Sequence, residues 1–318
     1  MPKKPKPADA TASSSLPTSV DELRAAEERV RADRRHANEL VGLVGLCDEC
    51  DDGRLRLAAL QACRSLFEGW AAAGELSLRR LGAVDAAQSE EEPLAAYQAW
   101  LLRQYLAFVG ALRKLLQGGS QPLALRLPAL DTLLVLAAAE ARRGSSGAVD
   151  PEALDAPNSA FRQALSALVQ SKGAAPPELL GRLAETHLVH LDASFYLLRH
   201  VHRLARLKPP HTPPKPERLL DLLLLVVPPP RDVEPRQASF LAPPPKPPRR
   251  KGGAAEGGGR AELAGWAAAS RQLLLRRKHA SAFCKAWRAL LEMELPPAAF
   301  RTEGRHSDES PRSPEEQE

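Results

Sequence analysis

The chain has 318 residues, of which 44% are hydrophobic, so it is long enough to bury a substantial core in one large domain or two small ones. Aromatic residues make up only 4%, and the apolar content is mostly Leu and Ala, which favours helices over strands and predicts an all-α fold. The net charge of +5 suits an acidic partner such as RNA, while four cysteines make no disulfide framework in so long a chain and no apolar run approaches the roughly 20 residues of a membrane span.

The N-terminal region is predicted to pass from a disordered leader into a charged helix. Residues 1–18 are polar and rich in Pro and cannot offset the entropy of ordering, so we expect a disordered basic leader. Residues 21–47 are predicted to form one mostly solvated helix, with Ser19 or Asp21 as its N-cap and acidic side chains in its first turn.

Three amphipathic helices are expected next, each with apolar residues at helical spacing. The first ends at Gly74. The second, within residues 93–119, has one broad apolar face and is stopped by its two final glycines. The third, within residues 122–147, has Pro128 near its beginning. The apolar face of the second helix consists of Tyr97, Leu101, Tyr105, Phe108, Leu112 and Leu115.

Shorter helices are predicted further along the chain. One begins with Asn158 or Ser159 as its N-cap. Two more are expected to form a hairpin, with Asp192 capping the second member. A short apolar helix is then expected between two Pro blocks.

The C-terminal part is predicted to alternate between flexible and helical segments. Residues 228–260 form a flexible Pro/Gly-rich basic linker. Residues 261–300 return to helix, with a break expected near Lys278–Ala280. Residues 301–318 form a disordered acidic tail.

This succession of helices with short joins predicts stacked antiparallel helices, as in HEAT- and armadillo-type α-solenoids. The helical-repeat domain spans residues 19–227 and continues in residues 261–300. Because the sequence has no strict period, a compact irregular bundle is the alternative.

Cysteine and histidine residues suggest a metal or redox site at two places. Cys47 and Cys50 have the C-x-x-C spacing of zinc sites and redox dithiols, but only Cys63 and His36 are near enough to complete a zinc site, and no strand precedes the motif. Two ordinary thiols at a helix end are the simpler interpretation.

A second group of histidines lies at positions 187, 190, 200 and 202. His187 and His190 are neighbours on a helix and could bind a metal together with Asp192, although histidines at such helix edges more often bond backbone carbonyls or face water. His279 and Cys284 suggest a base and a nucleophile, but they lie about 140° apart on a helix, and Cys284 is expected in a packing face.

No motif for a hydrolase, a metalloprotease or a nucleotide site occurs, so we expect no catalytic, cofactor-binding or metal-binding residues. Two basic tracts predict nuclear targeting or contact with RNA phosphates, with a solvated linker as the simpler interpretation. Their residues are Lys3, Lys4, Lys6, Lys246, Arg249, Arg250 and Lys251.

The helices, in order, resemble the N-terminal portion of the nucleolar complex protein 4 family. "ACRSLFEGWAAAGEL" is similar to a C-x-x-L-F helix of that family, and "YQAWLLRQYLAFVGALRKLLQ" is similar to its aromatic helix. "HASAFCKAWRALLEMELP" resembles its F-x-x-x-W helix, which is followed by Leu-Pro. The positions that carry the resemblance are Tyr97, Trp100, Arg103, Tyr105, Phe283, Trp287, Leu291, Leu295 and Pro296.

The resemblance implies a non-enzymatic scaffold of small-subunit ribosome biogenesis, located in the nucleus and nucleolus. It implies a protein partner in the small-subunit processome. The sequence itself adds the expectations of an indirect or weak contact with pre-rRNA, from the basic tracts, and of no cofactor and no membrane. The family's C-terminal helical domain, related to the CCAAT-binding-factor group, is expected to begin around Leu295, but an acidic, Ser/Pro-rich tail stands there instead. We therefore expect this chain to stop where its family continues.

Two other hypotheses come from the same sequence. One is a helical-repeat adaptor for protein interactions unrelated to ribosomes. The other is a metal or thiol enzyme built on Cys47 and Cys50 or on the histidine group.

Overall fold

The computed structural model describes residues 16–76, 93–143, 148–149, 151–156, 158–173, 175–207, 214–226 and 277–293. In these ranges the chain is helical apart from a two-residue antiparallel pairing of β1 (Arg142–Arg143) with β2 (Ala148–Val149). The predicted all-α class is thereby confirmed.

The first five α-helices are α1 (Val20–Ala32), α2 (Glu39–Glu49), α3 (Gly53–Ala73), α4 (Pro93–Gln117) and α5 (Leu123–Ala141), with the 3-10 turn η1 (Arg34–His36) after α1. The later ones are α6 (Ala160–Val169), α7 (Pro177–Arg182), α8 (Leu191–Ala205), α9 (Pro216–Leu224) and a helix of residues 277–293. The 3-10 turn η5 (Pro151–Asp155) precedes α6, and the π-helical turn η6 (Leu183–His187) continues α7.

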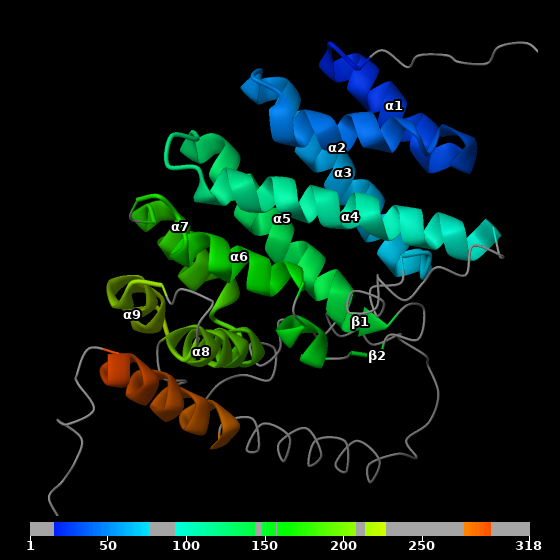
Figure 1. Ribbon diagram of the computed structural model, residues 1–318. Helices are drawn as coiled ribbons and strands as arrows, with labels where there is room; N and C mark the ends of the chain where they lie inside the picture. Colours follow the sequence, from blue (N-terminus) through cyan, green and yellow to red (C-terminus); the bar gives the residue numbers. More distant parts are fainter. Residues whose placement is uncertain are drawn as a thin grey trace, which may run out of the picture.

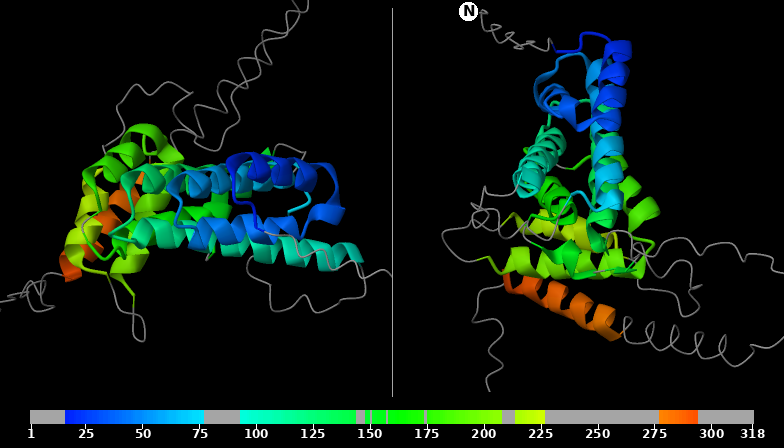
Figure 2. Two further views of the ribbon diagram at one scale, coloured as in Figure 1. Left: turned by 90° about the horizontal axis from the view of Figure 1, so that it is seen from above. Right: turned by 90° about the vertical axis from the view of Figure 1, so that its right-hand side faces the viewer.

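The helices are layered in chain order. Figure 1 shows α1 to α3 at one end, α4 to α6 in the middle and α8, α9 and the helix of residues 277–293 at the other end, and the side view in Figure 2 shows the same succession. The packing agrees: α2 contacts α3 and α4, α5 contacts α4 and α6, and α8 contacts α6 and α9.

The prediction of a single helix over residues 21–47 is wrong, because the helix is interrupted at Asp33. This residue is extended, with φ of −146° and ψ of 129°, and its carboxylate accepts a hydrogen bond from the backbone N–H of Arg35. Asp side chains compete in this way with the backbone for hydrogen bonds, which favours a new turn over continued helix. The result is α1, η1 and α2 in place of one rod.

Several predicted helix ends are confirmed. Ser19 caps α1 by accepting a hydrogen bond from the N–H of Glu22, and Ser159 caps α6 in the same way. Thr18 was predicted to belong to the disordered leader, but it takes part in the start of α1, because its backbone N–H donates to the Glu22 carboxylate at 2.8 Å. Gly74 ends α3 with φ of 76°, a left-handed conformation that glycine adopts without steric cost.

One predicted helix cap, at Asp192, is wrong. Asp192 does not cap α8, since the helix begins one residue earlier, after His190, and the Asp192 carboxylate accepts from the N–H of Ala193. For the break expected near Lys278–Ala280, residues 277–293 form one continuous helix, and residues 261–276 before it lie outside the described part of the chain.

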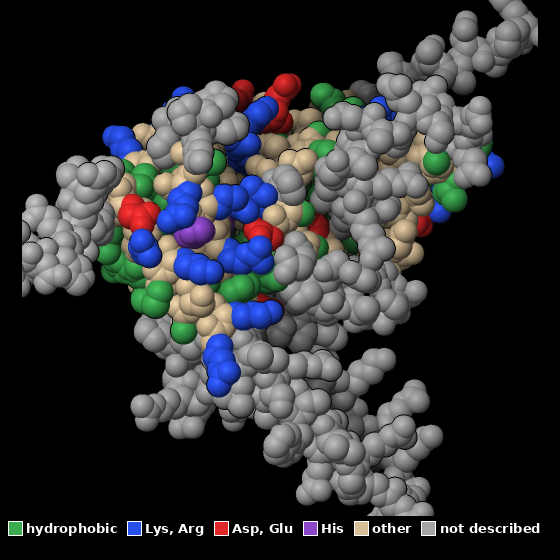
Figure 3. Space-filling view, turned by 60° about the horizontal axis from the view of Figure 1, so that its bottom comes forward, with side chains coloured by type: hydrophobic (Ala, Val, Ile, Leu, Met, Phe, Trp, Pro, Cys, Tyr) green, Lys and Arg blue, Asp and Glu red, His purple; other side chains and the backbone are tan. Residues whose placement is uncertain are grey.

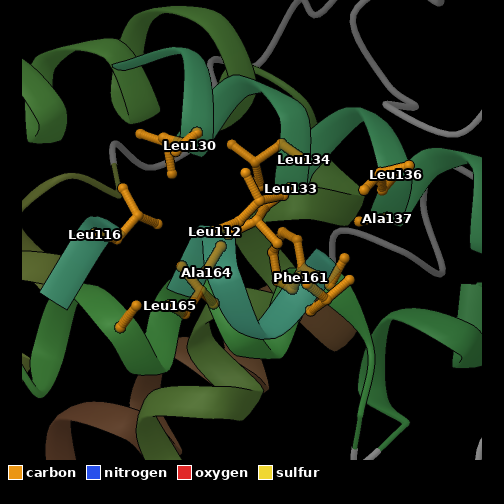
Figure 4. Packing of buried hydrophobic residues seen from close by; sticks show 14 of the residues in the cluster. Leu112, Leu116, Leu130, Leu133, Leu134, Leu136, Ala137, Phe161, Ala164 and Leu165 are labelled. Atoms are coloured by element: carbon orange, nitrogen blue, oxygen red, sulfur yellow. The ribbon is translucent and has the colours of Figure 1, made fainter. Parts of the chain in front are cut away.

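One hydrophobic core extends through the described helices, from Leu23 in α1 to Leu290 in the last helix. Figure 4 shows its centre, where Leu112, Leu133 and Phe161 lie together at the meeting point of α4, α5 and α6. The predicted apolar face of α4 is buried except at Tyr97, which is half-buried and lies under the guanidinium of Arg34. The middle of the molecule therefore joins its two ends through continuous apolar packing.

Several predicted segments lie outside the described residues. These are residues 1–15 of the leader, the linker of residues 228–260, the tail of residues 301–318 and residues 261–276 and 294–300 of the last helical segment. In the parts that the structure does describe, every helix is too short or too polar to span a lipid bilayer.

Candidate functional site

The two basic tracts predicted to serve nuclear targeting or RNA contact, at positions 3–6 and 246–251, lie outside the described residues. They remain predictions.

The C-x-x-C motif does not bring its own thiols together. Cys47 Sγ instead lies 4.0 Å from Cys63 Sγ in the interior, while Cys50 Sγ faces a backbone carbonyl. Burial, and then the neighbouring Cys47, raises the pKa of the Cys63 thiol well above its usual range, so this thiol is a poor nucleophile and a poor metal ligand. His36 faces Glu39 at 3.0 Å and is not directed at the thiols.

The clustered histidines also separate in space. His187 Nε2 lies 3.4 Å from Asp131 Oδ1, whereas His200 Nε2 lies 3.1 Å from Ser166 Oγ. Burial would raise the pKa of Asp131, but hydrogen bonds from His187 and Arg182 outweigh it and hold that pKa at about 2. Among the described residues, no three His, Cys, Asp or Glu side chains are grouped so that they could hold a metal ion.

His279 and Cys284 do not form a nucleophile and its base. Cys284 is exposed, which corrects its expected place in a packing face, and His279 is buried with Nε2 at 2.9 Å from Ser194 Oγ. The helix of residues 277–293 turns the imidazole towards α8 and the thiol towards solvent.

Glu140 is the described carboxyl with the most strongly raised pKa. Burial raises this pKa to about 8 against the opposing effect of its hydrogen bonds. Tyr105 donates its hydroxyl to Oε1 at 2.7 Å, and the N–H of Ala160 reaches both carboxyl oxygens at 3.1 and 3.0 Å. Perturbed pKa values often mark active sites, but Glu140 is enclosed where α4, α5 and α6 meet, so it serves to join these helices.

Among the described residues, one groove of about 540 Å³ lies between α8 and the helix of residues 277–293 and is here called the α8 groove. Phe195 and Ala282 supply its apolar lining, and Ser281 lies at its edge. Its other lining side chains are basic: Arg199, His202, Arg277, Lys278 and Lys285. Figure 3 shows Lys and Arg side chains gathered around a histidine on this face of the molecule.

Part of the positive charge around the α8 groove is neutralised. Asp155 of η5 accepts from Arg199 and Arg203, both at 2.7 Å. Glu292 accepts from Arg206 at 3.0 Å and also pairs with a second arginine on its own helix. Asp155 thereby fixes the orientation of two arginines of α8, and Glu292 that of Arg206, which follows this helix.

The remaining cations of the groove have no such partner in the part of the chain that the structure describes. Among the described residues, no carboxylate pairs with Arg277, Lys278 or Lys285, and all three side chains are exposed. Partial burial and the positive charges of Arg206 and Lys285 lower the pKa of His202, so the imidazole is neutral at physiological pH. The α8 groove therefore has a surplus of permanent positive charge and suits an anionic ligand.

Contacts between α8 and the last helix hold the groove in shape. The buried hydrogen bond of Ser194 and His279 joins two positions 85 residues apart, and Ala286 and Leu290 are buried in the shared core. Sequence reasoning missed this site because its cations come from two distant segments. The one signal was the basic pair Arg277 and Lys278 at the beginning of an amphipathic helix.

Comparison of the chain with models of protein families, with curated proteins and with solved structures gave no match. The structure therefore places the protein in a class by its architecture alone: its described part is helical, with layered helices and a basic groove at one end.

Proposed function

We propose that this chain is a non-enzymatic helical scaffold of ribosome biogenesis, with its helices stacked as in HEAT- and armadillo-type solenoids. The observation that carries the scaffold is the single hydrophobic core, which includes residues from α1 through to the last helix. In a stacked architecture each layer buries its apolar side on the next and leaves its outer surface for partners. The layered order of the helices supports this arrangement (Figures 1 and 2).

The proposed role in ribosome biogenesis is based on the resemblance to the nucleolar complex protein 4 family. Four of the aromatic landmarks of that resemblance, Tyr97 and Trp100 on α4 and Phe283 and Trp287 on the last helix, are half-buried against the core, and a fifth, Tyr105, is fully buried in it. Residues in such positions are constrained by packing, which supports a shared helical framework.

Several features support the absence of catalysis. Glu140 and Cys63, two groups with raised pKa values, are enclosed in the core, and the histidine on the same described helix as the exposed Cys284, His279, is buried. By contrast, the described lining of the α8 groove supplies positive charge and no paired acid and base. Such a surface suits binding better than turnover.

The proposed partner is a protein of the small-subunit processome, with weak or indirect contact to pre-rRNA and a location in the nucleus and nucleolus. The surplus of cations at the α8 groove and the net charge of +5 support contact with an RNA-rich assembly.

Tagging the full chain tests this proposal. We expect a fluorescent fusion to accumulate in nucleoli, and an epitope-tagged form to co-sediment with precursor small-subunit particles and to recover pre-rRNA. The tag alone serves as the control. A fusion that stays excluded from nucleoli, or a preparation without pre-rRNA, would contradict the ribosomal role.

The alternative is a helical-repeat adaptor unrelated to ribosomes, which the same layered helices would serve equally well. Quantitative affinity purification separates the two functions. Stable protein partners without processome subunits or pre-rRNA would favour the adaptor.

A further inference from the structure

We infer that the α8 groove binds a segment of single-stranded nucleic acid, with phosphates against Arg277, Lys278 and Lys285 and a base against Phe195. The inference specifies the single-stranded form of the nucleic acid and the side chains that contact it, which the proposed function leaves open. It deepens that function by locating the RNA contact, and to that extent it rests on it.

Charge is the first argument. The three cations on the last helix have no carboxylate partner among the described residues, whereas the α8 arginines are held by Asp155 and Glu292. Unpaired Lys and Arg side chains attract phosphates, and each phosphate neutralised releases counterions, which favours binding. Among the described residues, therefore, the last helix presents the cations without a carboxylate partner, and the arginines of α8 are held in place.

The lining of the groove is the second argument. Phe195 is half-buried, and the Arg199 guanidinium lies 5.8 Å from the centre of its ring. Asp155 holds Arg199 in place, so the phenyl ring and the guanidinium form a prepared surface. Bases stack on aromatic rings and on Arg without regard to sequence. An acidic peptide would match the cations but would leave this stacking surface unused.

The size of the groove is the third argument. Its volume of about 540 Å³ lies within the range of about 300–1,000 Å³ found for ligand pockets, which suits a few atoms of backbone and one or two bases. A double helix is too wide to enter such a space, so the ligand is single-stranded.

Fluorescence anisotropy with the purified full chain tests the inference. The probes are short labelled RNA and DNA oligonucleotides of the same mixed sequence, measured over a range of salt concentrations. We expect Lys278→Glu combined with Lys285→Glu to weaken binding at least about tenfold, and a wild-type salt slope of about −2 for three phosphate contacts to become shallower. Both lysines are exposed, so the variant is expected to fold.

The matched control combines Arg54→Glu with Lys172→Glu. Both side chains are exposed, they lie outside the groove, and they change the net charge by the same amount. We expect this control to bind within about twofold of the wild type. Equal weakening in the two variants would overturn the inference, because it would show a response to net charge alone.

Phe195→Leu tests the stacking surface. We expect binding to weaken several-fold with the salt slope unchanged, because a base contact is lost and no phosphate contact is. Inorganic polyphosphate or poly-glutamate that competes as well as the oligonucleotides would assign the groove to generic polyanions or acidic peptides, and would overturn the inference.

The result is separable from the ribosomal proposal. Binding by the purified chain, together with absence from nucleoli in cells, would reject the ribosomal role and retain the groove assignment. Nucleolar accumulation that the Lys278→Glu and Lys285→Glu variant retains, with no oligonucleotide binding by the wild type, would reject the groove assignment alone.

Discussion

The carboxyl of Glu140 in the middle of the molecule is buried and hydrogen-bonded, whereas three cations of the α8 groove at its C-terminal end are exposed. Where α4, α5 and α6 meet, Glu140 is buried and its carboxyl is bonded by Tyr105 and by the first N–H of α6. At the α8 groove, by contrast, Arg277, Lys278 and Lys285 are exposed without a carboxylate partner among the described residues. The middle uses polarity to join helices, and the end leaves charge available for a ligand.

This contrast separates perturbed groups from functional ones. The pKa of Glu140 is raised to about 8 by burial, which alone would suggest an active site. Because Glu140 is enclosed, its replacement is instead expected to change the stability of the fold and the dependence of that stability on pH. The groove residues are expected to influence binding and to leave stability nearly unchanged. The four variants below test this division, since each is expected to change stability without altering the groove's cations.

Phe67→Ala is expected to have the largest effect. Phe67 is fully buried and lies 5.3 Å from the Tyr105 ring and 5.4 Å from the Phe108 ring, so its removal leaves a cavity between α3 and α4. We expect the free energy of unfolding in urea to fall by about 3–5 kcal/mol. Leu94→Ala, at a position 54% exposed, is the control and should change it by less than about 0.5 kcal/mol. A small loss for Phe67→Ala would mean that the core is not continuous there.

His200→Gln is expected to change the response to acid. Burial, and then the charges of Arg203 and Arg162, lowers the pKa of His200 to about 3, so the folded state keeps the ring neutral while the unfolded state takes up a proton below its ordinary pKa of about 6.5. Wild-type stability from this site therefore falls as the pH falls, by roughly 2.5 kcal/mol between pH 7 and 4.5.

The readout for His200 is the difference between the free energies of unfolding of wild type and variant at these two pH values. We expect the free energy of unfolding to fall less for the variant than for the wild type between pH 7 and 4.5. A difference that stays constant with pH would show that His200 has the same pKa in the folded and unfolded states, against the lowered value expected here.

Glu140→Gln is expected to act in the opposite pH range. Because the folded pKa of about 8 lies above the unfolded value of about 4.3, the folded state holds the extra proton, and stability from this site falls as the pH rises. Between pH 6.5 and 8 the free energy of unfolding of the wild type should fall by roughly 1.5 kcal/mol, whereas that of the variant should not show this fall. Urea unfolding at both pH values measures this, with the exposed Glu28→Gln as the control. Parallel losses in all three proteins would place the titration elsewhere.

Ser194→Ala is expected to have the smallest effect. It removes the hydrogen bond between Ser194 and His279 and leaves a buried ring nitrogen without its partner, at a cost of about 1 kcal/mol. Hydrogen exchange should then show faster opening of the helix of residues 277–293 than in the exposed control Ser281→Ala. Equal exchange in the two variants would mean that apolar packing alone fixes this helix.

Local sequence predicted the helices better than their ends. The apolar face of α4 and the caps Ser19 and Ser159 were predictable, because spacing and capping depend on neighbours along the chain. The break at Asp33 was missed, since a helix-compatible pattern continues across it and only the competition of one carboxylate ends α1.

The candidate site was less predictable than the fold. Sequence reasoning selected the C-x-x-C spacing, but tertiary packing pairs Cys47 with Cys63 and turns Cys50 aside. It also treated the histidines at positions 187 and 200 as one group, whereas they face different partners on different helices. Spacing on one helix does not reveal which neighbouring helix a side chain meets.

The sequence by itself determined that the described chain is helical, which of its faces are apolar and where several helices begin, because these depend on periodicity and on contacts within a few residues. Only the tertiary structure decided that α8 and the helix of residues 277–293 lie side by side and form a basic groove. The physical reason is that the groove's charges come from segments far apart in the chain, which only the shared core brings together.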